Sequence, residues 1–127
     1  MTTAKASSYC WKRVLGGLSG AMSIGTGAYG AHGLKSDDTT SATYKSVFET
    51  GSRYQLVHSA LLVATPAILP CTKSANIAGA FFAAGMAMFS GSCYAVGLTQ
   101  DRSNGKLAPV GGFALIGGWL SLALFKR

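Results

Sequence analysis

Charge is scarce in this sequence of 127 residues. Charged side chains make up 12% of it, about half the ~25% that is typical of soluble domains. Acids are rarer still, because the chain has only four of them and the first is Asp37. So few carboxylates argue against paired acid and base catalysis. With 49% hydrophobic residues, the composition argues against a soluble domain and favours a membrane protein.

Cysteine is also rare. Cys10, Cys71 and Cys93 show no CxxC spacing and cannot all pair, so the sequence indicates neither a zinc site nor a disulfide framework. The formal net charge of +7 is compatible with nucleic-acid binding, but the basic residues stand singly or in pairs at the borders of apolar runs. That placement is typical of membrane proteins, in which flanking lysines and arginines set the orientation.

Four apolar runs are candidates to cross a bilayer, whose hydrocarbon core is ~30 Å thick. Two of them contain no charged residue, which is informative because a charge at the centre of a membrane helix costs ~2.5–3.5 kcal/mol. The second run is short, and Pro66 inside it predicts a kink or a relieved final turn. We therefore predict an all-α, integral membrane four-helix bundle. Its single domain covers 14–127, with spans at about 14–34, 54–70, 74–98 and 107–125.

The basic segment 1–13 contains Ser, Thr, three basic residues and no acid, as in a mitochondrial import signal. A secretory signal is the rival interpretation, although the apolar run that follows is long enough to span. Four crossings place both termini and the 71–73 turn on one side, with six basic residues and no acid. The other side has five basic residues and all four acids. The positive-inside rule then places the termini in the matrix or cytoplasm.

Between the first two spans lies the one substantial polar stretch, SDDTTSATYKSVFETGSR. A residue among 36–38 can cap a helix there. An apolar stripe follows at three- and four-residue spacing, made up of Tyr44, Val47, Phe48 and Gly51. This pattern predicts a short interfacial helix that leads into the second span.

Small residues recur at four-residue spacing in the first, third and fourth spans. Because no hydrophobic force draws helices together in lipid, such stripes favour close backbone packing. We expect the first and third spans to pack directly along their stripes, and Gly91→Leu to impair assembly. The predicted packing residues are Gly17, Ser19, Ser23, Gly27, Ala31, Gly79, Ala83, Ala87, Gly91 and Gly118.

Most potentially reactive side chains are predicted to lie at the membrane level opposite the termini. The simplest interpretation pairs Glu49 with Arg53 and makes His58 a hydrogen-bonded core histidine. A second is a proton or ligand site, because ionisable residues within membrane spans are functional candidates. A metal site from His32, His58 and Cys93 has only three soft ligands and is the least favoured. The predicted polar cluster is His32, Glu49, Arg53, Tyr54, Gln55, His58 and Tyr94.

The sequence contains no arrangement typical of an enzyme. Its serines lack an adjacent histidine and acid. The glycine-rich GTGAYG lies inside an apolar run, where it cannot form a phosphate loop. We therefore expect no catalysis, no metal and no cofactor, with a bound phospholipid as the one group left open.

Four short stretches carry a resemblance to a known family. They are GAYGAHGLK (27–35), FETGSRYQLVH (48–58), FSGSCY (89–94) and PVGG with a later GW (109–112 and 118–119). In this order and at this spacing the chain resembles the transmembrane protein 256 family, which has bacterial and mitochondrial members. The resemblance implies a four-helix inner-membrane protein without an established activity.

Two functional hypotheses follow from the pattern and the resemblance. The first is a non-catalytic accessory or structural subunit of a mitochondrial inner-membrane respiratory-chain assembly: complex I, complex IV or a supercomplex. Its partners would be membrane lipids and that complex, without nucleic acid. The alternative is a small carrier or channel for a proton, an ion or a lipid that uses His58 and His32. A bacterial membrane protein of stress or envelope physiology is a third, weaker hypothesis.

Overall fold

The computed structural model describes residues 10–126, and this part of the chain is helical without strands. The predicted all-α class is therefore confirmed. A short 3₁₀ helix, η1 (Arg102–Gly105), precedes the last of four long helices. Those four are α2 (Trp11–His32), α3 (Thr39–Ile68), α4 (Thr72–Thr99) and α5 (Ala108–Leu124). The predicted import signal lies outside the described residues, except for 10–13.

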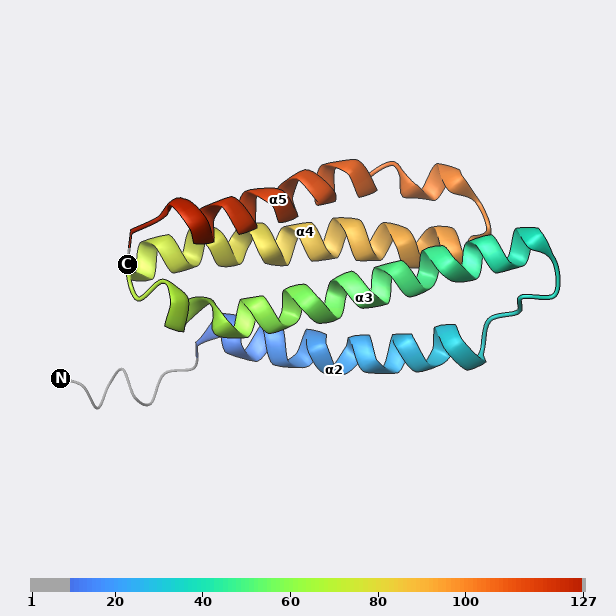
Figure 1. Cartoon of the computed structure of the whole chain (residues 1–127), viewed down its shortest axis with the longest axis horizontal. Coiled ribbons are helices and arrows are strands. Elements are labelled where there is room, and N and C mark those ends of the chain that lie inside the picture. Colours follow the sequence, from blue (N-terminus) through green and yellow to red (C-terminus); the bar gives the residue numbers. More distant parts are fainter. Residues whose placement is uncertain (1–9, 127) are drawn as a thin grey trace.

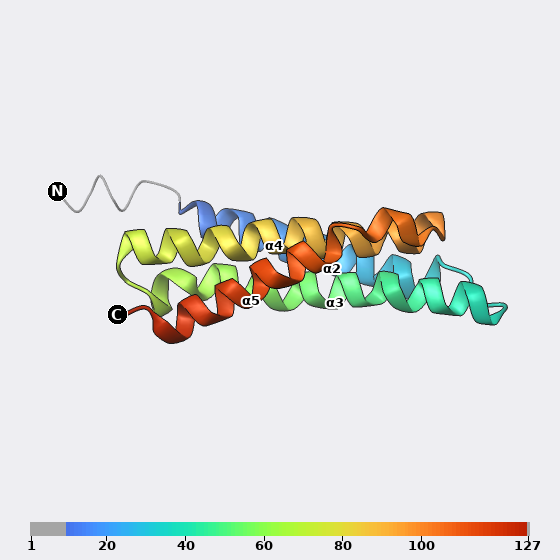
Figure 2. The ribbon, with the colours of Figure 1, turned by 90° about the horizontal axis from the view of Figure 1, so that it is seen from above.

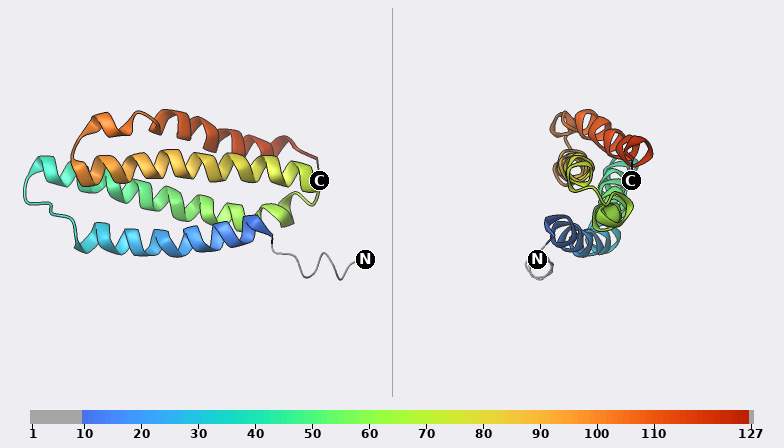
Figure 3. Two further views of the ribbon diagram at one scale, coloured as in Figure 1. Left: turned by 180° about the vertical axis from the view of Figure 1, so that it is seen from behind. Right: turned by 90° about the vertical axis from the view of Figure 1, so that its left-hand side faces the viewer.

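Consecutive helices run antiparallel and lie side by side (Figure 1). Seen end-on, α2 and α5 lie on opposite sides of the pair formed by α3 and α4 (Figure 3). Figure 2 shows α5 running at an angle across α4. The start of α2, the α3–α4 turn and the end of α5 share one end of the molecule, here called the N end. The α2–α3 loop and η1 form the far end.

The second helix is longer than the sequence indicates. Helices α2, α4 and α5 differ from the predicted spans by three residues or fewer at each end, but α3 begins at Thr39 instead of near Tyr54. The predicted interfacial helix is thus the first part of α3 and not a separate element. Asp38 caps α3 by accepting hydrogen bonds from the N–H and hydroxyl of Ser41, which hold the pKa of its carboxyl below the usual value. Pro66 lies in the last turn, where the helix ends.

The first and third helices do not pack closely along the length of their small-residue stripes, contrary to the prediction; they meet through side chains, at Gly79 under Lys12 and Trp11 and where Thr26 meets Tyr94. Close backbone contacts join α2 to α3, α3 to α4 and α4 to α5. The stripe of α2 faces α3, where the Ser52 hydroxyl donates to the Ser23 carbonyl at 3.0 Å, and a Cβ at position 27 would lie 3.0 Å from Ser52 Oγ. A Cβ at Gly91 would meet nothing within 4 Å. The prediction that Gly91→Leu impairs assembly therefore has no basis in the packing.

Two small apolar clusters hold α3, α4 and α5 together. One contains Leu62, Phe82, Met86 and Leu115, and the other, nearer the N end, contains Leu69, Ala75 and Ala78. Gly118 lets α5 approach Phe82, because a Cβ there would lie 2.6 Å from the Phe82 ring. Apart from these clusters, much of the buried surface is polar, with serines on α2, α3, α4 and α5.

The outer surface of the helices is apolar. Large apolar side chains are exposed on all four helices, and the most exposed are Leu124 at 75%, Phe113 at 74%, Leu18 at 68% and Ile24 at 67%. Among the described residues, two helical stretches are both long and apolar enough to cross a membrane: Thr72–Thr99 and Arg102–Leu124. Helices α2 and α3 fall below that hydropathy level. A surface of this kind is unusual for a protein in water.

Two glycines allow a test of the helix packing, because Gly51 lies in a close helix contact and Gly91 borders open space. In Gly51→Ala the new Cβ would lie 2.7 Å from Cys93 Cβ and 3.2 Å from the Ser90 carbonyl, so α3 and α4 must move apart. We expect Gly51→Ala to lower the free energy of unfolding by ~1–3 kcal/mol. Gly91→Ala is the matched control, because both substitutions gain similar helix propensity. Unfolding in detergent, followed by circular dichroism, measures the difference, and equal stability of the two variants would contradict the packing described.

Candidate functional site

Gln55 is the centre of a hydrogen-bonded chain that joins three helices. From α3 its Nε2 donates to the carbonyl and to the hydroxyl of Ser19 on α2, at 3.0 and 3.1 Å. Its Oε1 accepts a hydrogen bond from the Tyr94 hydroxyl on α4. The chain continues to Thr26, whose Oγ1 lies 3.0 Å from Tyr94 Oη, and to Ser59, which donates to Ser19 Oγ at 2.8 Å. These bonds fix the relative positions of α2, α3 and α4.

The interior polar groups are satisfied throughout the described residues. Buried side-chain nitrogen and oxygen atoms there all have hydrogen-bond partners. Many partners are helix carbonyls: Ser90 donates to Gly51 at 2.7 Å, and Thr65 donates to Leu61 at 2.7 Å. Inside a membrane an unpaired polar group costs several kcal/mol. The arrangement therefore meets the strictest requirement that lipid imposes on a helical protein.

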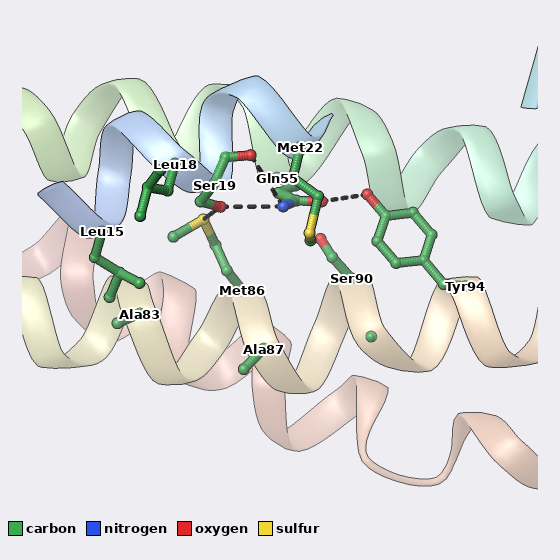
Figure 4. A pocket seen from close by; sticks show the side chains of 11 residues that line it. Leu15, Leu18, Ser19, Met22, Gln55, Ala83, Met86, Ala87, Ser90 and Tyr94 are labelled. Carbon is green, nitrogen blue, oxygen red and sulfur yellow. Dashed lines mark hydrogen bonds between the residues drawn. The ribbon is translucent and has the colours of Figure 1, made fainter. Parts of the chain in front are cut away.

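A groove lies where α2 and α4 fail to meet (Figure 4). It encloses a cavity of about 380 Å³. Its walls are the apolar side chains of Leu15, Leu18 and Met22 on α2 and the small residues Ala83, Ala87 and Gly91 on α4. Figure 4 shows the hydrogen bonds of Gln55 to Ser19 and Tyr94 lying at one side of this space. Ala83, Ala87 and Gly91 of the predicted α4 stripe thus line a groove, whereas Gly79 of the same stripe contacts Lys12 and Trp11 of α2.

His58 is a hydrogen-bonded histidine in the middle of α3. Its Nε2 lies 3.1 Å from Trp119 Nε1 on α5. An indole N–H can only donate, so Nε2 is the acceptor and the ring proton sits on Nδ1. Nδ1 then donates to the Tyr54 carbonyl at 2.7 Å. Both ring nitrogens are therefore in use, and binding a metal ion or a second proton would break one of these bonds.

The predicted polar cluster separates into three parts. Gln55 and Tyr94 meet, as described. Tyr54 and His58 stack, with ring centroids 5.9 Å apart, on the side of α3 nearest α5. The remaining residues lie outside the hydrogen-bonded chain: His32 is exposed at the end of α2, Glu49 is half-buried and Arg53 is exposed. Because α3 starts earlier than predicted, Gln55 and His58 lie near its middle and not at its far end.

For several residues of the site the sequence predicts another role or none. Ser19 belongs to a predicted packing stripe, Trp119 belongs only to the GW motif of the family resemblance, and Thr26 and Ser59 belong to no predicted site. The signal was available, because serines and threonines inside an apolar run must find partners within the protein. Among the described residues no group of three histidine, cysteine or acidic side chains is placed to hold a metal ion. Cys93 instead packs against Gly51.

The comparisons with known proteins and the apolar surface both indicate a membrane protein. Residues 26–112 match a family described as protein of unknown function, DUF423. A UPF0382 membrane protein of Staphylococcus saprophyticus is 42% identical over 113 residues, which cover 87% of this chain and 92% of that protein. Relatives of the same name in Staphylococcus haemolyticus (42% identical, 87% and 90% covered) and Staphylococcus aureus (41%, 89% and 93%) are similar. No solved structure matches the chain.

The hydrogen bond between Trp119 and His58 can be tested by removing its donor. Trp119→Phe keeps an aromatic ring but leaves His58 Nε2 unpaired, so we expect a loss of ~1–3 kcal/mol in stability. Tyr54→Phe is the matched control, because His58 bonds to the carbonyl of Tyr54 and not to its hydroxyl. Nitrogen NMR of the wild-type ring should show the Nδ1–H tautomer. An Nε2–H tautomer, or equal loss in both variants, would refute the assignment.

Proposed function

We propose that all four helices cross one membrane, because the chain belongs to the DUF423 family and its relatives are membrane proteins. In this arrangement the N end faces one side of the membrane and the far end faces the other. The two helices α4 and α5 are apolar enough to be recognised by hydropathy, while α2 and α3 are not. The direction in which their polar residues point accounts for that difference.

The serines and the threonine of α2 are turned away from the surrounding medium. Ser23 is buried, and Ser19 and Thr26 belong to the hydrogen-bonded chain around Gln55. The outer face of the same helix presents Leu18 and Ile24. Mean hydropathy averages over both faces, so it understates the apolar character of the surface that lipid would contact. This observation, polar groups paired inside and apolar side chains outside, carries the proposal.

The charges of α3 lie in its first half. A helix of 30 residues is about 45 Å long, which exceeds the ~30 Å hydrocarbon core. Lys45, Glu49 and Arg53 fall in the half that reaches the far end. The half that follows Tyr54 contains no charged residue, and its histidine, His58, is neutral and hydrogen-bonded through both ring nitrogens. The helix can therefore span while its charged turns extend into the headgroup region.

For the role of the protein we propose a non-catalytic structural subunit of a larger membrane assembly. The interior polar groups are occupied by one another, and the two most exposed large apolar side chains, Phe113 and Leu124, both lie on α5. Its close contacts are with α4 and, to a small extent, α3, which leaves a face available to a partner helix. The carrier or channel alternative has less support, because both nitrogens of His58 are already bonded.

The compartment is a further part of the proposal. We place the chain in the mitochondrial inner membrane, in a respiratory-chain assembly, with the termini in the matrix. The support is the acid-free, basic N end and the resemblance to a family with mitochondrial members. The relatives compared above are bacterial, and their names state only that they are membrane proteins.

Four crossings predict which thiols a membrane-impermeant maleimide reaches from each side. Cys71 is exposed in the α3–α4 turn, and the N–H and hydroxyl of Ser74 lower the pKa of its thiol, which favours labelling. In a Cys10→Ser background, Cys71 should react from one side only. With Cys71 also replaced by Ser, Ser36→Cys should react from the opposite side. Labelling of both from the same side would show that α3 does not cross.

Membership of a larger assembly predicts slow migration of the tagged chain on a native gel after mild detergent extraction. Phe113→Ala, at the most exposed aromatic position of α5, should reduce the fraction that migrates with the assembly. Ile24→Ala on α2 is the control, since it removes an apolar side chain of comparable exposure, 67% against 74%, from another helix. Recovery of the wild-type chain only as a free monomer would overturn the proposed role.

A further inference from the structure

A buried lysine closes the N end of the groove between α2 and α4. The side chain of Lys12 is only 5% exposed and lies over Gly79, where a Cβ would approach within 2.9 Å of Lys12 Cδ. Its Nζ donates to Asn76 Oδ1 at 2.6 Å, and Trp11 Nε1 donates to the same oxygen at 3.1 Å. One turn further along each helix, Leu15 and Ala83 begin the walls of the groove. Lys12 therefore lies at the end of the groove that is nearest the proposed membrane surface.

No acidic side chain of the chain can neutralise this lysine. The four acids are Asp37, Asp38, Glu49 and Asp101, and all of them lie toward the far end. An ammonium group has three N–H donors, and Asn76 takes one. A buried cation without an opposite charge is costly, and its other described contact, the Trp11 ring 4.8 Å from Nζ, carries no net charge. The described residues supply no opposite charge, so the site is suited to an anionic ligand.

The groove itself calls for an apolar chain. Most of its lining is leucine, methionine, alanine and glycine, and the polar residues that also line it are already hydrogen-bonded: Gln55 to Ser19 and Tyr94, and Ser90 to Gly51. No polar group is left to recognise a polar ligand in its middle. Small residues on α4 leave the space open beside Gly91. An occupant must thus be apolar along the groove and anionic at its N end.

We propose that an anionic phospholipid occupies this groove, with one acyl chain between α2 and α4 and its phosphate beside Lys12 and Asn76. A helix from a second copy in the same orientation fits less well, because its N end also lacks any acid. Trp11 at the same level is typical of the headgroup region of a membrane. The proposal depends on the membrane insertion proposed above and not on the larger assembly, and the cysteine labelling tests insertion separately.

The test is lipid retention by the full chain in detergent, measured by native mass spectrometry. The probes are phosphatidylglycerol and phosphatidylcholine with identical acyl chains. The wild-type chain should retain phosphatidylglycerol about fivefold better, the effect of one lysine near an anionic headgroup. Lys12→Gln should abolish this preference, whereas Lys126→Gln, which replaces an exposed lysine after α5 at the same end, should keep it.

A second pair of variants tests the acyl chain. Gly91→Leu fills the groove and should lower the retention of both lipids at least severalfold, while Gly17→Leu, also in open space but outside the groove, should not. Ala87→Leu repeats the test should Gly91→Leu lose its helical circular dichroism. Equal retention of both lipids by the wild-type chain, an unchanged preference in Lys12→Gln, or full retention in the groove-filling variants would each overturn the proposal.

Discussion

The requirement that every buried polar group find a partner governs this structure, and Gln55 is where it acts most directly. A single amide accepts from Tyr94 and donates to Ser19, so that one side chain sets the separation of α2, α3 and α4. In water such a network would compete with solvent. In lipid the alternative is an unsatisfied amide, and the network therefore favours the association of the three helices.

The same requirement explains why α2 does not pack closely against α4. Hydrogen bonds from serines and Gln55 hold α2 against α3. Close contacts at glycines hold α3 against α4 and α4 against α5. Nothing equivalent joins α2 to α4 along their length. The two are linked by side chains at Lys12, Gln55 and Tyr94, and the groove remains between these links. The cavity is thus a consequence of which helix faces carry hydrogen-bonding groups.

The distribution of charge along the chain has an equally simple effect. Residues at the N end are basic without any acid, and the acids are confined to the far end. Lys12 is consequently buried against Gly79 with an amide as its partner instead of a carboxylate. A soluble protein would seldom bury a lysine in this way. For a protein in contact with anionic headgroups, the missing charge is available from the surroundings.

The sequence was sufficient to predict an all-helical protein with long apolar helices. Runs at 74–98 and 107–125 contain no charge, and they coincide closely with α4 and α5. Short motifs such as FETGSRYQLVH also indicate the family, and the match over 26–112 confirms it. The polar stretch before the second span predicts a helix that leads into that span, and in α3 the two form one continuous helix, Thr39–Ile68.

What the sequence determined alone is which residues share a face of a helix, since that depends only on a period of 3.6 residues. It therefore identified the stripe of Ser19, Ser23 and Gly27, and the stripe of Ala83, Ala87 and Gly91. Which neighbour each face meets was decided only by the tertiary structure, in which the first stripe packs on α3 and the second borders the groove. Helical periodicity carries no information about partners, because the partner is chosen by hydrogen bonds and contacts between distant residues such as Gln55, Ser19 and Tyr94.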